Sequence, residues 1–181
     1  MKLFTKTEKN KSGMTLIEIL LYLSISAGVL LTISVFITAV LRARVKNESI
    51  TLVNEEAVQI ISQFEREIAD ADIITQPTEG TSAATLGFQV VGDPVETITL
   101  QTDTIVYTLT GNPEIDLNST NTNVTSLSFT RMNTISDNES IKIEFTLERN
   151  NINNLNEYEY SKTFYTTINI NRKTGEPETY I

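Results

Sequence analysis

Residues 19–41 read ILLYLSISAGVLLTISVFITAVL, and none of these 23 side chains is charged. A helix of this length is roughly 35 Å long at about 1.5 Å per residue, whereas the hydrocarbon core of a bilayer is about 30 Å thick. The alternative is a helix buried on all sides in a soluble core, but a chain of 181 residues is too short to surround it. The run therefore predicts one transmembrane helix.

The residues ahead of this run form a basic head, in which Glu8 is outnumbered by Lys2, Lys6, Lys9 and Lys11. A basic head before an apolar run is typical of a secretory signal peptide. However, the apolar segment of such peptides usually has about 7–15 residues, and residues 39–42 make a poor cleavage motif. A plain, uncleaved signal-anchor is therefore one alternative.

The junction between the two segments reads Lys11-Ser12-Gly13-Met14-Thr15-Leu16-Ile17-Glu18. It resembles the class III signal of type IV pilins and type II secretion pseudopilins, in which a basic leader and a glycine precede hydrophobic-Thr-Leu-Ile-Glu. The resemblance implies that a prepilin peptidase cleaves between Gly13 and Met14 and then N-methylates Met14. The chain departs from the pattern in having Met14 where the family most often has Phe, and in placing Ser12 between the basic residue and the glycine.

Glu18 places a carboxylate at the start of an otherwise uncharged span. On insertion scales a charge at the centre of a membrane helix costs about 2.5–3.5 kcal/mol, so such a residue is expected to have a function and a partner. The family resemblance implies that Glu18 acts in subunit assembly, by pairing with the N-terminal amine of an adjacent subunit.

After the apolar run the pattern becomes amphipathic, with apolar residues at steps of three and four, which indicates one buried helical face. These residues are Val53, Ala57, Ile60, Ile61, Phe64, Ile68, Ala71 and Ile74. Pro77 should prevent the helix from continuing. We therefore expect one long helix from Met14 to about Ile74. Its apolar half, residues 14–41, follows the leader 1–13, and its amphipathic half, 42–75, precedes a β-rich domain, 76–181.

Residues 59–71 resemble particular subunit types within the pilin and pseudopilin family. They read QIISQFEREIADA and are similar to the helix end of J-type minor pseudopilins and W-type minor pilins. An ordinary solvated helix face, with Glu65, Arg66 and Glu67 in water, is the alternative.

The last part of the chain alternates apolar with polar residues, most clearly at 141–149, and is rich in Thr and Asn, which favour strands and turns. Residues 101–103 predict a hairpin turn. The expected strands are 86–91, 95–100, 104–109, 126–132, 141–149 and 158–170. The predicted fold class is α+β and pilin-like, with the long N-terminal helix packed on a C-terminal antiparallel β-sheet.

The composition excludes several kinds of site. Without His or Cys the chain has no Ser-His-Asp triad, thiol nucleophile or zinc site, and its net charge of −9 speaks against nucleic-acid binding. Acidic pairs such as Glu157/Glu159 are explained more simply as side chains on the solvent-facing side of a strand or turn. We therefore expect that the protein is not an enzyme and binds no cofactor. Residues 116–123 and 137–139 are oxygen-rich, but they lack EF-hand spacing, and we assign no metal ligand.

The resemblance thus implies a minor pilin or pseudopilin of a type IV pilus or type II secretion system. The implied partners are prepilin peptidase, other pilin or pseudopilin subunits contacting the N-terminal helix, an inner-membrane assembly platform and the lipid bilayer. The implied location is a single pass through the cytoplasmic membrane with the C-terminal domain outside the cytoplasm, and later the filament. A pilus-displayed adhesin or binding module and a membrane-anchored protein with an unprocessed signal-anchor are the alternatives.

Cleavage distinguishes the pilin-like hypothesis from the unprocessed anchor. Mass spectrometry of the chain isolated from cells that contain a prepilin peptidase is expected to find N-methylated Met14 as the first residue. Recovery of an N-terminus at Met1 would contradict the resemblance.

Overall fold

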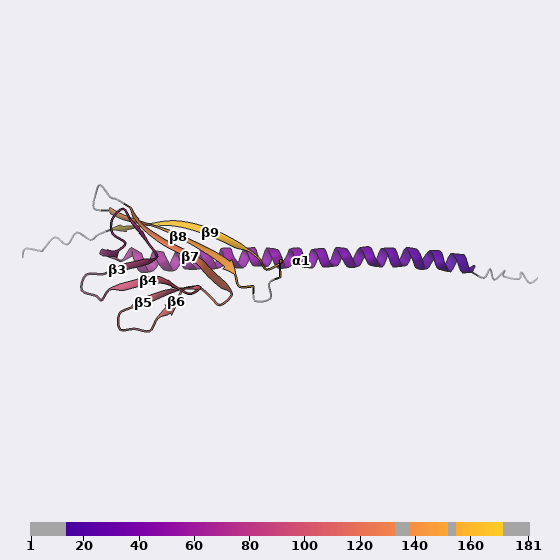
Figure 1. Cartoon of the computed structure of the whole chain (residues 1–181), viewed down its shortest axis with the longest axis horizontal. Helices are drawn as coiled ribbons and strands as arrows, with labels where there is room; N and C mark the ends of the chain where they lie inside the picture. The colour runs from indigo at the N-terminus through magenta and orange to yellow at the C-terminus, as the bar shows by residue number, and fades with distance from the viewer. Residues whose placement is uncertain (1–13, 133–137, 152–154, 172–181) are drawn as a thin grey trace, which may run out of the picture. The chain divides into compact units, whose positions relative to one another are not determined.

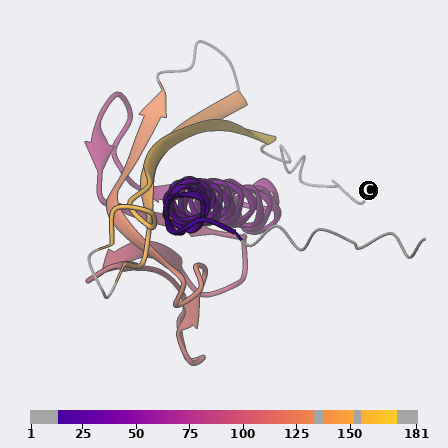
Figure 2. The ribbon, with the colours of Figure 1, turned by 90° about the vertical axis from the view of Figure 1, so that its right-hand side faces the viewer.

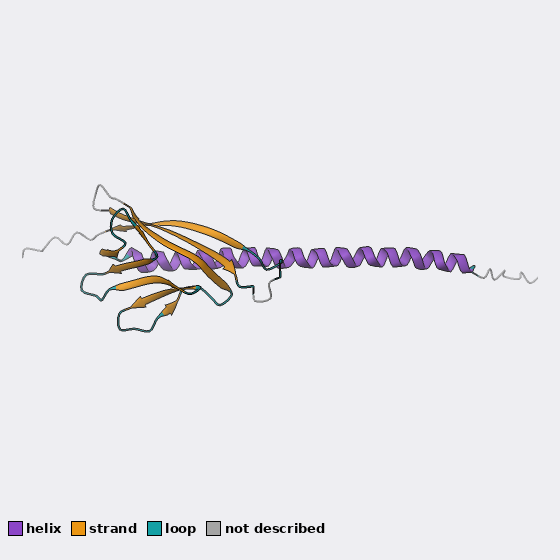
Figure 3. Cartoon of the chain, in the orientation of Figure 1, coloured by secondary structure: helices purple, strands orange, loops and turns teal. Residues whose placement is uncertain are grey.

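The computed structural model describes residues 14–132, 138–151 and 155–171. The chain divides into two compact units, Met1–Ala43 and Arg44–Ile181. Helix α1, Leu16–Ala69, contributes to both units, and the strands found in the described residues belong to the second (Figures 1 and 3). The predicted α+β fold class is confirmed.

The first unit is described from Met14 onward and consists mainly of the apolar part of α1. Every side chain of residues 16–43 is exposed. The hydroxyls of Ser24, Thr32 and Thr38 donate to carbonyls one turn earlier, at 2.8, 2.8 and 2.9 Å, so the helix satisfies them itself. Of the helices in the described residues, α1 alone is long and apolar enough to cross a membrane, a property that it shares with signal sequences.

The remainder of α1 is the central element of the second unit. Its buried positions recur at steps of three and four, as predicted: Ser49, Val53, Ala57, Ile60, Phe64 and Ile68. These side chains form one stripe, and the residues between them, such as Glu55, Val58 and Ser62, are exposed. The amphipathic pattern is thus confirmed, and it places the apolar stripe against the strands.

Two antiparallel sheets pack on this stripe. The first has the order β1-β3-β4-β5-β6 and the second β2-β7-β8-β9. The strands of the first are β1 Ile73–Gln76, β3 Thr85–Gln89, β4 Glu96–Gln101, β5 Thr104–Leu109 and β6 Ile115–Asp116. Those of the second are β2 Ser82–Ala83, β7 Thr122–Met132, β8 Asn138–Arg149 and β9 Ser161–Asn171.

Among the described residues of the second unit, the two sheets flank its part of α1 and leave one side of that part uncovered, as the view along the helix in Figure 2 shows. Phe64 lies at the centre of the core, with its ring edge-on to Phe129 at 6.1 Å and to Phe145 at 5.9 Å between ring centroids. From the first sheet, Leu86 and Phe88 join the same fully buried cluster. Each sheet therefore depends on the helix for its hydrophobic face.

All six predicted strands exist, with shifted ends except for Thr104–Leu109, which matches β5. The predicted turn joins β4 to β5, where Gln101 pairs with Thr104. Thr102 in this connection has a φ of 56°, in the left-handed region that β-branched residues rarely adopt.

The predicted end of the helix was wrong, because α1 ends at Ala69 and Ile73 and Ile74 belong to β1. Asp72 explains the change: its backbone N–H donates to the carbonyl of Gln89 at 3.0 Å, and its carboxylate accepts from Val91 N at 2.9 Å. These contacts turn the chain into the sheet before Pro77 is reached.

Two further expectations need correction. The strands form two sheets instead of one, and residues 158–160 belong to the connection before β9. Tyr158 closes a turn there by donating its N–H to the carbonyl of Leu155 at 2.9 Å, and backbone bonding to the end of β8 begins at Tyr160, whose carbonyl accepts from Arg149 N at 2.9 Å.

Truncation of the central ring tests the shared core. Phe64→Ala is expected to lower the free energy of unfolding by about 3–5 kcal/mol, because it removes a fully buried aromatic side chain and leaves a cavity. Thermal unfolding of the full chain in detergent would measure this. Val58→Ala, at a position of the same helix that is 63% exposed, is the control and should change the value by less than about 0.5 kcal/mol. Equal effects of both substitutions would contradict the assignment of the core.

Candidate functional site

The start of α1 carries two of the predicted site residues, and Thr15 caps it. The carbonyl of Thr15 accepts from the N–H groups of Glu18 at 3.1 Å and Ile19 at 3.2 Å, and its hydroxyl accepts from Glu18 N at 3.4 Å. Thr15 and Glu18 have the spacing of a capping box, S/T-x-x-E, of which the threonine half is formed here. Our sequence analysis missed this role of Thr15, although the spacing alone could have indicated it.

The structure places Met14 directly before the capping residue, outside the helix and exposed, while Gly13 and the rest of the leader lie outside the described residues. Glu18 lies in the first turn, where the partial positive charge of the helix N-terminus favours a carboxylate. Within the described part of the chain Glu18 makes no ion pair. A cut before Met14 would therefore create a cationic amine one residue ahead of the cap.

In the second unit, α1 is joined to the first sheet through Glu56. Its carboxylate accepts from the backbone N–H of Ser119 and, at 3.0 Å, from the hydroxyl of the same residue. The neighbouring Asn118 is buried: its side-chain oxygen accepts from Ile105 N at 2.7 Å, and its amide donates to the carbonyl of Thr122 at 3.0 Å. The oxygen-rich segment 116–123 thus serves to join helix and sheet.

These contacts bear on the calcium hypothesis. Asn118 uses its oxygen within the fold, and Glu139, from the second oxygen-rich segment, is buried beside Arg131. Asp137, in that same segment, lies outside the described residues. Among the residues that the structure describes, no group of three or more acidic side chains is arranged to hold a metal ion.

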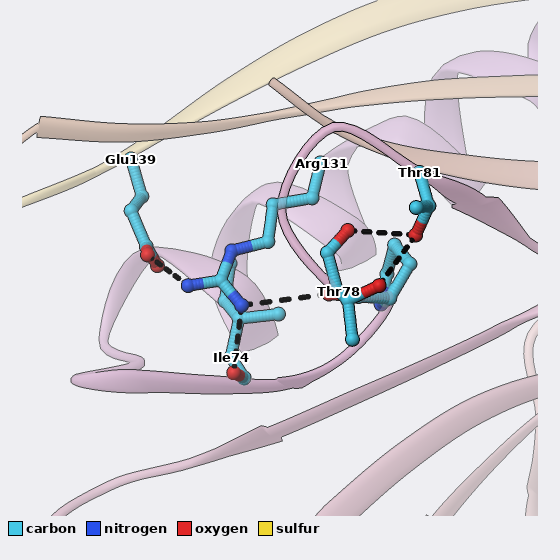
Figure 4. A network of polar contacts seen from close by, with 6 residues as sticks. Ile74, Thr78, Thr81, Arg131 and Glu139 are labelled. Atoms are coloured by element: carbon cyan, nitrogen blue, oxygen red, sulfur yellow. Dashed lines mark hydrogen bonds and ion pairs between the residues drawn. The ribbon is translucent and has the colours of Figure 1, made fainter. Parts of the chain in front are cut away.

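A buried ion pair connects β7 and β8 to the loop that follows β1. The Arg131 side chain is 14% exposed and that of Glu139 7% exposed, and Nη2 of Arg131 donates to Oε1 of Glu139. Nη1 donates to the carbonyls of Ile74 at 3.1 Å and Pro77 at 3.4 Å, as Figure 4 shows in part. Arg131 therefore ties the edge of the first sheet to the second.

The backbone of Arg131 strengthens this connection. Its N–H donates to the carbonyl of Thr81 at 3.1 Å, and its carbonyl accepts from Gly80 at 3.0 Å. Within the loop the Thr81 hydroxyl donates to the carbonyl of Thr78 at 2.7 Å (Figure 4). The loop between β1 and β2 is thus held by one residue of β7.

The charged segment at the end of α1 lies on the surface. Arg66 donates to one carboxylate oxygen of Glu67 from Nε at 2.9 Å and from Nη2 at 2.7 Å, with its own side chain 74% exposed. Close to it, Tyr107 donates its hydroxyl to Glu96 at 2.7 Å. Burial, together with this hydrogen bond, raises the pKa of Tyr107 above its ordinary value. Within residues 59–71, the charged face with Glu65 and Arg66 is therefore exposed, whereas Phe64 lies in the core.

Comparison with protein-family models, with curated proteins and with solved structures finds no match to this chain. What the structure itself supplies is the architecture: a long apolar N-terminal helix that continues onto C-terminal antiparallel sheets, as in pilins.

Loss of the buried arginine tests the connection between the sheets. Arg131→Met is expected to destabilise the fold by about 3–5 kcal/mol, since it removes the guanidinium that lies beside the buried carboxylate of Glu139 and bonds the carbonyls of Ile74 and Pro77. Chemical denaturation of the full chain in detergent would measure the change. Lys142→Met removes an ion pair of 3.8 Å whose side chains are 45% and 44% exposed, and should cost only about 0–1 kcal/mol. A small effect of Arg131→Met would show that the pair is dispensable.

Proposed function

We propose that the chain is a minor pilin or pseudopilin, which a prepilin peptidase cleaves between Gly13 and Met14 and which is then built into a type IV pilus or type II secretion pseudopilus. One observation carries the proposal: the junction that resembles the prepilin signal falls directly at the start of the long helix. Met14 precedes the capping residue, and the helix begins at Leu16.

The exposure of the apolar half of α1 supports an assembly role. Large apolar side chains from Leu16 to Leu41 are between 48% and 78% exposed in the isolated chain. Surfaces of this kind need a lipid or protein partner. In the membrane that partner is lipid; in a filament it is the corresponding helices of other subunits. The same helix therefore fits both stages of pilus assembly.

Glu18 supports a defined register in that assembly. The hydroxyls of Ser24, Thr32 and Thr38 bond carbonyls of their own helix, whereas Glu18 is the one charged side chain of residues 16–41. Cleavage would leave a positively charged N-terminal amine on Met14, opposite in charge to the Glu18 carboxylate. We expect the carboxylate of Glu18 in one subunit to pair with the amine of Met14 in the next.

Removal of this carboxylate tests the proposal. Glu18→Ala and Glu18→Gln should be cleaved and methylated normally. Their incorporation into filaments should fall to about a tenth or less, because an amine without its partner is costly in an apolar environment. Filaments sheared from cells and quantified against the membrane-bound pool would give the ratio.

The substitutions at Glu18 are not expected to disturb the helix cap at Thr15. Thr15 bonds the backbone N–H of Glu18, not its carboxylate, so both substitutions keep the observed hydrogen bonds at the start of the helix. Ser24→Ala is the matched control, since it removes a polar group of the same span whose hydroxyl bonds only Leu20. Normal incorporation of the Glu18 variants would refute the assembly role.

A further inference from the structure

The loop before β9 is fastened to α1 close to the end of the apolar run. Nζ of Lys46 donates to the carbonyl of Glu159, and the hydroxyl of the fully buried Ser49 lies between two carbonyls, that of Val45 at 3.0 Å and that of Glu157 at 3.4 Å. Arg149 completes the contact by donating from Nη1 to the hydroxyl of Ser49 at 3.1 Å. The loop therefore lies beside residues 46–49 of the helix.

The side chains around this contact combine cations with aromatic and apolar groups. The guanidinium of Arg149 lies over the ring of Tyr158 at 4.6 Å, and the ammonium of Lys46 lies over the ring of Tyr160 at 5.9 Å. Leu155, in the same loop, is 45% exposed. We call these five residues, Lys46, Arg149, Leu155, Tyr158 and Tyr160, the collar. Tyr, with Lys and Arg whose stems are apolar, is typical of a membrane–water interface.

The length of the chain places the collar near the membrane surface. Lys46 comes five residues after Leu41, the last residue of the uncharged run. At about 1.5 Å per residue this is roughly 8 Å, and even a fully extended chain would span at most about 18 Å. The interfacial layer on each side of the hydrocarbon core is about 5–8 Å thick. Residues 41–46 are helical, so the shorter distance applies, and Lys46 comes about as far beyond the uncharged run as the interfacial layer is thick.

We propose that the collar is a membrane-docking surface, which rests on the headgroup layer of the bilayer that α1 spans before the subunit enters a filament. The inference rests on the proposed membrane anchorage. Glu157 and Glu159, in the same loop, offset the charges of Lys46 and Arg149. Tyr158 and Tyr160 are half-buried, Tyr160 against the core, and Leu155 is exposed. Leu155 and the outer edges of the two rings therefore carry the contact, and it requires no anionic lipid.

Fluorescence tests the docking surface directly, because the chain contains no Trp. Tyr158→Trp and Tyr160→Trp each introduce a single reporter. The full chain is reconstituted in phosphatidylcholine vesicles, with and without phosphatidylcholine brominated near the headgroup end of its acyl chains. Both variants should lose Trp fluorescence in the brominated vesicles relative to the vesicles without bromine. Their emission maximum should lie at a shorter wavelength than that of the chain unfolded in denaturant.

Two controls separate the possible results. Tyr165→Trp is the matched control: Tyr165 is 60% exposed and lies under Lys142 at 5.4 Å, so it has the same kind of cation contact on the outer face of the second sheet. It should not be quenched. Tyr22→Trp lies within the apolar run and should be quenched strongly.

Quenching at Tyr22 but not at Tyr158 and Tyr160 would overturn the docking surface and leave the membrane span intact. Absence of quenching at Tyr22 would overturn the span, and with it the proposed function. Equal quenching at Tyr165 would show that the domain meets the membrane through another face.

Discussion

A single helix has to satisfy two different surroundings, and the rest of the structure depends on this constraint. Along residues 16–43 the side chains of α1 are exposed throughout, so the fold offers them no cover. From Ser49 onward one stripe of the same helix becomes the centre of a core that two sheets share. The sheets have no other hydrophobic partner of comparable size among the described residues, and the apolar half has no partner of its own. This imbalance is the physical basis of the proposed association with lipid and with other subunits.

The sequence was most informative where burial has a simple period. The stripe from Val53 to Ile68 and the alternation in β8 could be predicted because each depends on a single element facing one core. The end of α1 could not, because Asp72 is turned aside by contacts with Gln89 and Val91, which are distant in the chain. The short strands β1, β2 and β6 were missed for a similar reason, since two to four residues carry too little pattern.

The features of the candidate site likewise divide into local ones, which the sequence could predict, and tertiary ones, which it could not. Met14 and Glu18 are readable because the signal is a contiguous motif, and the cap formed by Thr15 is equally local. The pairing of Arg131 with Glu139, the bond from Glu56 to Ser119 and the collar are tertiary features. Lys46 and Glu159, for example, are 113 residues apart. No local pattern distinguishes Tyr158 and Tyr160 from strand residues, which is why both were assigned to a strand.

The distribution of satisfied polar groups limits where partners can act. Inside the second unit Glu56, Asn118 and Arg131 are already engaged, and in the apolar run the hydroxyls of Ser24, Thr32 and Thr38 bond their own helix. In the proposed assembly, Glu18 supplies the one charged contact of this run, and the shape of the helix surface supplies the apolar ones. Leaving the bilayer would cost the subunit the lipid around residues 16–41 and, if the collar docks on headgroups, the contacts of Tyr158 and Tyr160. In the proposed filament a neighbouring subunit would have to offset both losses, and Glu18 would supply only one ion pair toward this. The larger share would then come from helix packing along the whole apolar run, which is longer than a signal peptide requires.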